Sequence, residues 1–141
     1  MSQVLVFGSI NMDLVVETRA FPRLGETLPG ASFATHAGGK GANQAVAAAR
    51  LGGQVTMLGR VGSDGFGTEL KARISAEGVA TRWVQETRGV STGIAAITVC
   101  DADNAIVVVP GANACLSAAD LDMAESAFAE ADIVQIGRAH V

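Results

Sequence analysis

The stretch that decides the fold is A-G-G-K-G-A-N-Q-A-V-A-A-A-R-L-G-G, residues 37–53. Its alanine-rich part, Gly41–Leu51, is predicted to be a helix, because alanine favours helices and the paired glycines after it end the pattern. The apolar run Val55–Leu58 follows the helix, and a similar run, Val4–Phe7, precedes it. Such runs are typical of strands buried on both faces of a parallel sheet. The sequence therefore predicts an α/β protein, with a layered, mostly parallel sheet flanked by helices.

Further elements extend this pattern in both directions. Apolar residues recur every four positions from Phe66 to Ile74, which predicts a helix over Gly67–Glu77. Another helix is predicted to begin at Ser117, because Asp120 follows it at the spacing of a capping box. A last strand begins at 133. Four short β-favouring segments are predicted to form an appended antiparallel flap, or small β lid: Leu14–Thr18, Ser32–His36, Ile94–Cys100 and Ala105–Val109.

Composition narrows the class of protein. The 141 residues are 49% hydrophobic and 17% charged, which is typical of a globular domain. The net charge of −4 argues against nucleic acid or an anionic membrane as a partner. The amino terminus lacks the features of a signal peptide and no apolar run reaches membrane-spanning length, so we expect a cytoplasmic protein. Cys100 and Cys115 have no histidine at ligand spacing, which predicts packed free thiols and no metal site.

The glycine-rich stretches do not match nucleotide-binding motifs. A P-loop requires G-x-x-x-x-G-K-[ST], but around Lys40 its first glycine is replaced by Ala34 and its hydroxyl residue by Gly41. The dinucleotide fingerprint G-x-G-x-x-G fails twice, because Gln44 and Leu70 stand where its last glycine should be. A dinucleotide-binding domain is therefore disfavoured.

A pair of polar residues follows directly from the first strand. Ligands of open α/β sheets bind beyond the carboxyl ends of strands, and in an extended chain Asn11 and Asp13 point to the same side. A carboxylate can accept hydrogen bonds from two adjacent sugar hydroxyls, and an asparagine amide adds a donor and an acceptor. This arrangement suits a polyol, although an Asx turn into the next strand would explain the same pair.

The loop before the alanine-rich helix supplies the rest of the candidate site. Its glycines let the backbone approach a ligand closely, and the free N–H groups of the helix start can donate to it. Asn43 can present its amide to hydroxyl groups, whereas Lys40 is either a mobile cation at the site or a solvated loop lysine. The predicted substrate-binding residues are Asn11, Asp13, Gly39, Lys40, Gly41, Ala42 and Asn43.

Five motifs in this order resemble one family. G-S-I-N-M-D, G-G-K-G-A-N-Q-A-V-A-A-A-R-L-G, V-G-S-D-x-x-G, S-T-G-I-A and P-G-A-N-A are similar to the motifs of the ribokinase-like carbohydrate kinases, which include fructokinase and adenosine kinase. The resemblance implies that Asn11, Asp13 and Gly39–Asn43 bind a sugar. It also implies that the short strands form a lid that closes over the sugar and pairs with a second subunit in a homodimer.

The resemblance covers residues 1–135 and only the amino-terminal half of the family's domain. It implies that the longer parent uses ATP, Mg²⁺ and a monovalent cation such as K⁺ to phosphorylate a pentose, with D-ribose to ribose 5-phosphate favoured. The family's D-T-x-G-A-G-D signature, which supplies the catalytic base and an anion hole, does not occur here. We therefore expect no catalytic residue and no ATP, cofactor or metal site in this chain, and no activity from it alone. A further acidic sugar contact is expected at 137, where Gly137 stands.

Residues 136–141, I-G-R-A-H-V, are predicted to be a non-native tail. The resemblance ends at Gln135, and a buried strand should not continue through a glycine and two polar residues. The same six residues are encoded by one frame of a widely used sequencing adapter, ATC GGA AGA GCA CAC GTC, followed there by a stop codon. A natural truncation or a divergent tail is the alternative.

Other interpretations stay open at this stage. The parent could be another carbohydrate or nucleoside kinase of the same family. The chain could also be a non-enzymatic polyol-binding or lid-pairing module. His36, on a predicted lid strand, is interpreted as a surface or lid-packing residue rather than a general base.

Overall fold

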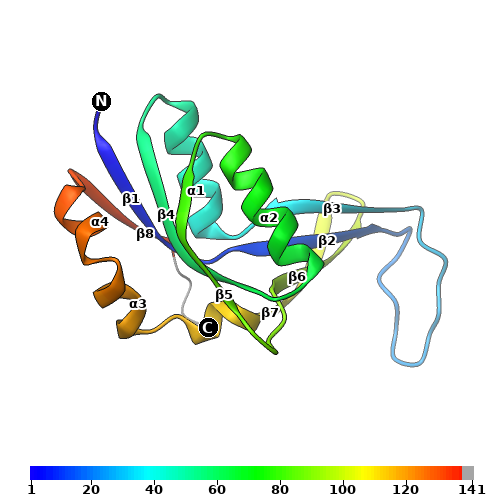
Figure 1. The fold of residues 1–141 in the computed structure, drawn as a ribbon. Helices are drawn as coiled ribbons and strands as arrows, with labels where there is room; N and C mark the ends of the chain where they lie inside the picture. The colour runs from blue at the N-terminus through cyan, green and yellow to red at the C-terminus, as the bar shows by residue number, and fades with distance from the viewer. Residues whose placement is uncertain (138–141) are drawn as a thin grey trace.

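The computed structural model describes residues 1–137, and it alternates strands and helices along the chain (Figure 1). The predicted tail therefore begins inside the last strand, and its final four residues lie outside the described residues. In order, the elements are β1 (Gln3–Gly8), β2 (Asn11–Glu17), β3 (Ser32–Gly38), α1 (Lys40–Arg50), β4 (Gln54–Gly62), α2 (Gly65–Ala76), β5 (Ala80–Thr87), β6 (Gly93–Cys100), β7 (Asp103–Val109), the 3-10 turn η1 (Gly111–Cys115), α3 (Ala118–Met123), α4 (Glu125–Glu130) and β8 (Ile133–Gly137).

The main sheet is parallel, in the order β5-β4-β1-β8. Helices α1 and α2 cover one face, and α3 and α4 lie on the other (Figure 1). This arrangement confirms the predicted α/β fold with a layered parallel sheet flanked by helices. Within residues 1–137 no helix is both long and apolar enough to cross a membrane.

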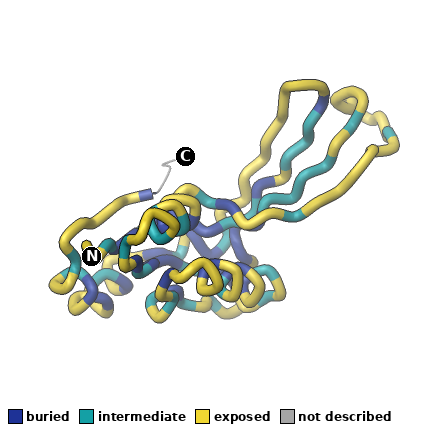
Figure 2. Tube along the Cα trace, turned by 90° about the horizontal axis from the view of Figure 1, so that it is seen from above, coloured by how far each residue is buried: buried dark blue, intermediate teal, exposed yellow. Residues whose placement is uncertain are grey.

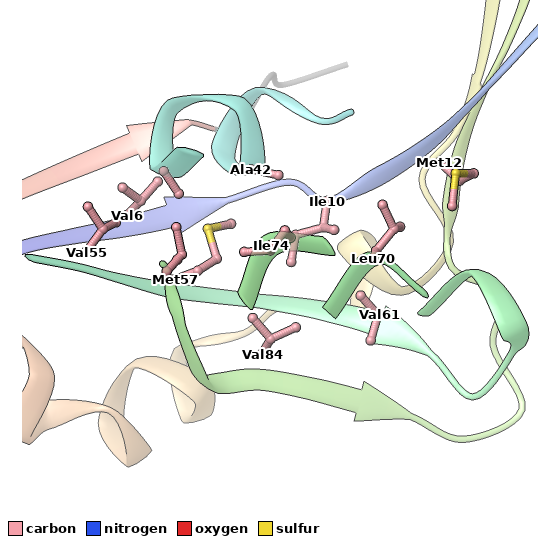
Figure 3. Packing of buried hydrophobic residues seen from close by; sticks show 12 residues of the cluster. Val6, Ile10, Met12, Ala42, Val55, Met57, Val61, Leu70, Ile74 and Val84 are labelled. Atoms are coloured by element: carbon pink, nitrogen blue, oxygen red, sulfur yellow. The ribbon is translucent and has the colours of Figure 1, made fainter. Parts of the chain in front are cut away.

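Two apolar clusters hold the layers together, one on each face of the main sheet. Neighbouring strand residues point to opposite faces, so Val6 packs under α1 and α2 whereas Leu5 packs toward α3 and α4. Figure 3 shows the first cluster, which joins Val6 and Met57 of the sheet with Ala42 of α1 and with Leu70 and Ile74 of α2. Burial of such side chains stabilises the fold by about 1.5–3 kcal/mol each.

The four short segments form a second sheet, called here the outer sheet, in the order β3-β2-β6-β7. The expected flap is antiparallel throughout, but the outer sheet is mixed. The pairs β2–β3 and β6–β7 are antiparallel, whereas β2 and β6 run parallel. The reason is that β2 and β6 each lead one hairpin away from the main body in the same direction. Figure 2 shows the outer sheet projecting from that body, with most of its length exposed or only partly buried.

Two local features differ from the sequence-based expectations. Strand β5 completes one edge of the main sheet, although its mixture of charged and apolar residues does not match the apolar runs from which the other strands of that sheet are predicted. The helix predicted from Ser117 does begin with the expected capping interaction with Asp120. However, it is divided in two at Ala124, where no glycine or proline marks the break.

Candidate functional site

The candidate site lies where β1 leaves the main sheet and β2 begins. Register places Asn11 of β2 opposite Gly38 of β3, so the glycine loop follows beside the end of β1. Gly39 has φ = 94°, and a Cβ there would lie 2.5 Å from the carbonyl oxygen of Ser9 and 2.8 Å from the nitrogen of Asn11. Only glycine allows this approach, which brings the predicted loop against the predicted polar pair.

Helix α1 begins with its first backbone donors facing this junction. The N–H of Ala42 donates to the carbonyl of Ser9 at 3.1 Å, and that of Asn43 donates to the carbonyl of Gly39 at 2.9 Å. The N–H groups of Lys40 and Gly41 have no acceptor among the described residues. The helix start therefore keeps two donors available for a ligand, and its dipole favours negatively polarised groups there.

Asp13 offers acceptors on the face of β2 that it shares with Asn11. Its carboxyl group lies against the Cα of Gly38, where a Cβ would come within 2.5 Å of the carboxyl carbon. Burial raises the pKa of Asp13, and the neighbouring His36 opposes that rise. The carboxylate accepts no hydrogen bond from any described residue. Asp13 is therefore a partly buried acceptor without a protein donor, which is costly unless a ligand supplies one.

Asn113, in turn η1, is a site residue that the sequence analysis did not single out. Its side chain is buried beside the start of β2 and hydrogen-bonds to both the backbone of Ile10 and the side chain of Asn11. The sequence contains it only as part of P-G-A-N-A, without a signal for its partners. The contact joins residues that are about a hundred positions apart along the chain.

Two sets of polar contacts connect the segments around the site. Asp64 caps α2 through the N–H of Gly67 and also accepts from the N–H of Thr92 at 2.8 Å and from its hydroxyl at 2.5 Å. Burial alone would raise the pKa of Asp64, but these hydrogen bonds outweigh burial and lower it. The hydrogen bonds from Thr92 to Asp64 thus connect the S-T-G-I-A motif to the V-G-S-D-x-x-G motif beside β6.

The second set of contacts centres on an ion pair between β4 and the start of α3. Arg60 meets both carboxylate oxygens of Asp120, at 2.6 and 3.0 Å, and Asp120 also accepts from the N–H of Ser117 at 2.9 Å. Burial acts to raise the pKa of Asp120, but the hydrogen bonds from Arg60 and Ser117 lower it on balance. These contacts hold the segment that follows η1 against β4.

The structure does not bring all predicted residues into one set of contacts. Lys40 is exposed and pairs with no carboxylate among residues 1–137. Asn43 is exposed and lines a groove between α1 and α2, and no hydrogen bond joins its side chain to Asn11 or Asp13. Gly137 lies against the loop, where a Cβ would be 2.7 Å from the Cα of Gly41. An acidic side chain at 137 would therefore require β8 or α1 to shift.

Comparisons with known proteins agree on the class that this fold and site define. The model of the pfkB family of carbohydrate kinases matches residues 1–141, and the chain belongs to that family. It is 50% identical over 113 residues to ribokinase of Bacillus subtilis, a match covering 80% of this chain and 39% of the relative. It is also 41% identical over 122 residues to deoxyribokinase of Salmonella typhi, covering 86% of this chain and 40% of the relative.

Solved structures show the same fold. The structure of Arabidopsis thaliana ribokinase complexed with ribose and ATP superposes with a TM-score of 0.83 at 33% identity. That match covers 96% of this chain and 45% of the Arabidopsis chain. The chain thus spans about two fifths of the length of the curated relatives above.

Proposed function

We propose that this chain is the sugar-binding half of a longer kinase, called here the full-length kinase, which transfers phosphate from ATP to D-ribose. The observation that carries the proposal is Asp13, a partly buried carboxylate without a protein donor. It shares a face of β2 with Asn11 and packs against Gly38, two residues before the start of α1. Adjacent hydroxyl groups of a pentose are the neutral donors that such a carboxylate binds.

The role of this half is positioning. In phosphoryl transfer the protein mainly holds the acceptor hydroxyl in line and neutralises charge, so a fixed sugar contributes directly to the rate. Asp13 and Asn11 would hold ring hydroxyls, while Gly39–Asn43 would surround the sugar from the helix side. Lys40 would supply a mobile cation near the open mouth of the site.

The proposal assigns ATP, Mg²⁺ and K⁺ to the part of the full-length kinase beyond this chain. Its support is that the D-T-x-G-A-G-D signature, which the resemblance links to the nucleotide end of the reaction, does not occur in this sequence. The open edge of β8, where Ile133 and Val134 are exposed, supports a sheet that continues in that part.

The outer sheet is proposed to act as the lid over the sugar and as the dimer contact of the full-length kinase. Asn11 and Asp13 share one of its faces, whereas the residues alternating with them face the opposite way. Several large apolar side chains are exposed on its strands: Phe33, Ile106, Val107, Val108 and Val109. Exposed apolar surface of this kind is typical of an interface with another subunit.

A second pentose is also favoured by an observation. The similarity to a deoxyribokinase makes 2-deoxy-D-ribose the alternative acceptor, which differs from ribose by one hydroxyl. A site that hydrogen-bonds this hydroxyl should discriminate strongly against the sugar that lacks it. A nucleoside, or a polyol-binding module without kinase activity, remains the wider alternative.

A ligand screen tests the proposal. Thermal melts of the full-length kinase with D-ribose, 2-deoxy-D-ribose, fructose and adenosine should show the largest stabilisation with D-ribose. A coupled assay of ADP release should then give turnover with the same sugar. Stabilisation by a nucleoside alone, or by ribose without turnover, would contradict the proposed activity.

A further inference from the structure

Turn η1 buries the amide of Asn113 against the start of β2, where it makes three hydrogen bonds. Its Oδ1 accepts from the backbone N–H of Ile10 at 2.9 Å. Its Nδ2 donates to the carbonyl of Ile10 at 3.1 Å and to Oδ1 of Asn11 at 2.7 Å. Asn113 is 9% exposed, so these bonds replace water for nearly the whole side chain.

The backbone of Ile10 decides which way both amides point. A backbone N–H can only donate and a carbonyl can only accept, so the oxygen and nitrogen of the Asn113 amide are assigned by their two partners. The nitrogen of Asn113 therefore faces Asn11, and the atom of Asn11 that meets it must be the acceptor Oδ1. The Nδ2 group of Asn11 is left as a donor without an acceptor among residues 1–137.

Two glycines make room for this pair of amides. Gly93 lies beside Asn11 in the outer sheet, and a Cβ there would be 2.6 Å from Oδ1 of Asn11 and closer still to Nδ2 of Asn113. Gly111 has φ = 52° and lets η1 turn back onto the segment before β6, where the N–H of Ala112 donates to Ser91 at 2.8 Å. The S-T-G-I-A and P-G-A-N-A motifs thus together hold the amides of Asn11 and Asn113 in place.

We propose that Asn113 is a positioning residue for sugar binding: it orients the Asn11 amide so that Nδ2–H₂, and not Oδ1, is available on the face shared with Asp13. This inference rests on the proposed function. Asp13 can only accept, and the oriented Asn11 can then donate, so sugar hydroxyls find both an acceptor and a donor. If Asn11 were reversed, the same face would offer oxygen atoms alone, and a hydroxyl that accepts would lose its partner.

The test uses Asn113→Asp in the full-length kinase, because aspartate has the same shape but carries no N–H group. Its second oxygen would face Oδ1 of Asn11, and Asn11 is expected to reverse to donate to it. The KM for D-ribose should then rise roughly tenfold or more, while the KM for ATP stays within about twofold. Thermal melts identify any loss of folding. Gly93→Ala, which displaces the same amides from another strand, carries the test if Asn113→Asp does not melt cooperatively.

The same substitution in an Asn11→Ala background separates positioning from general damage. With no amide to orient, Asn113→Asp should change the KM for D-ribose by less than about twofold there. An equal rise in both backgrounds, or no rise in either, overturns the inference. If Asn11→Ala itself leaves the KM for D-ribose unchanged, the proposed sugar site has failed and the inference fails with it. If Asn11→Ala raises that KM and Asn113→Asp does not, only the inference is overturned.

Discussion

Replacing Asp13 with alanine in the full-length kinase should weaken D-ribose binding by roughly 2–5 kcal/mol, or about 30-fold to several thousand-fold in Kd. The magnitude follows from the surroundings of the carboxylate. It is partly buried and accepts no hydrogen bond from a described residue, so its partners in the complex would be the sugar hydroxyls. Removing it leaves those hydroxyls without a charged acceptor.

The same substitution should not destabilise the protein. Burial raises the pKa of Asp13, so at neutral pH the ionised carboxylate opposes folding, and its removal should leave Tm unchanged or slightly higher. Calorimetric titration of D-ribose and of an ATP analogue, with melts of each variant, measures both effects. Glu17→Ala is the matched control, because Glu17 lies on the same strand and face but farther from the site. Equal ribose affinity for wild type and Asp13→Ala, or a loss confined to the nucleotide, would refute the assignment.

Three further predictions follow from other groups in the structure. Burial raises the pKa of Asp13 and His36 partly opposes that rise, so ribose affinity should fall as the pH drops through this raised pKa. In His36→Gln the pKa of Asp13 should rise further, and ribose titrations at several pH values should show the loss of affinity at a higher pH. A shift of that loss to lower pH contradicts the pairing of His36 with Asp13. Arg60→Met leaves Asp120, whose side chain is 2% exposed, buried without its partner, and should cost about 3–5 kcal/mol of unfolding free energy in denaturant titrations. Because the folded-state pKa of Asp120 is lowered in the wild type, this difference from wild type should shrink as the pH falls below the ordinary carboxyl pKa of about 4; a difference that stays constant as the pH falls contradicts the ion pair. Finally, residues 1–141 expressed alone should release no ADP in a ribose-dependent manner, and robust turnover by the purified chain would contradict the division of the site between two halves.

The parts of the fold that could be predicted are those that depend on local sequence patterns. The apolar runs Val4–Phe7 and Val55–Leu58 gave β1 and β4, and the alanine-rich stretch gave α1, because strand and helix periodicity depend on neighbouring residues. The parallel pairing of β2 with β6 could not be predicted in this way. It depends on how two distant hairpins leave the main body, which no local pattern records.

The same division applies to the candidate site. Asn11 and Asp13 were accessible from the sequence because they follow a buried strand, and Gly39 because glycines before a helix indicate a close backbone approach. Asn113 was not accessible, since its importance depends on Ile10, at the other end of the described chain. The helix break at Ala124 also has no local signal, and nothing in the sequence distinguishes it from a helix interior.

A crystal structure of the full-length kinase with D-ribose is the most direct test of the claim that this half of the molecule binds the sugar. Two ribose hydroxyls should lie within hydrogen-bonding distance of the Asp13 carboxylate, with Nδ2 of Asn11 directed at the sugar and the loop Gly39–Asn43 beside it. Ribose bound away from β2 and the start of α1, with Asp13 facing solvent, would contradict the account.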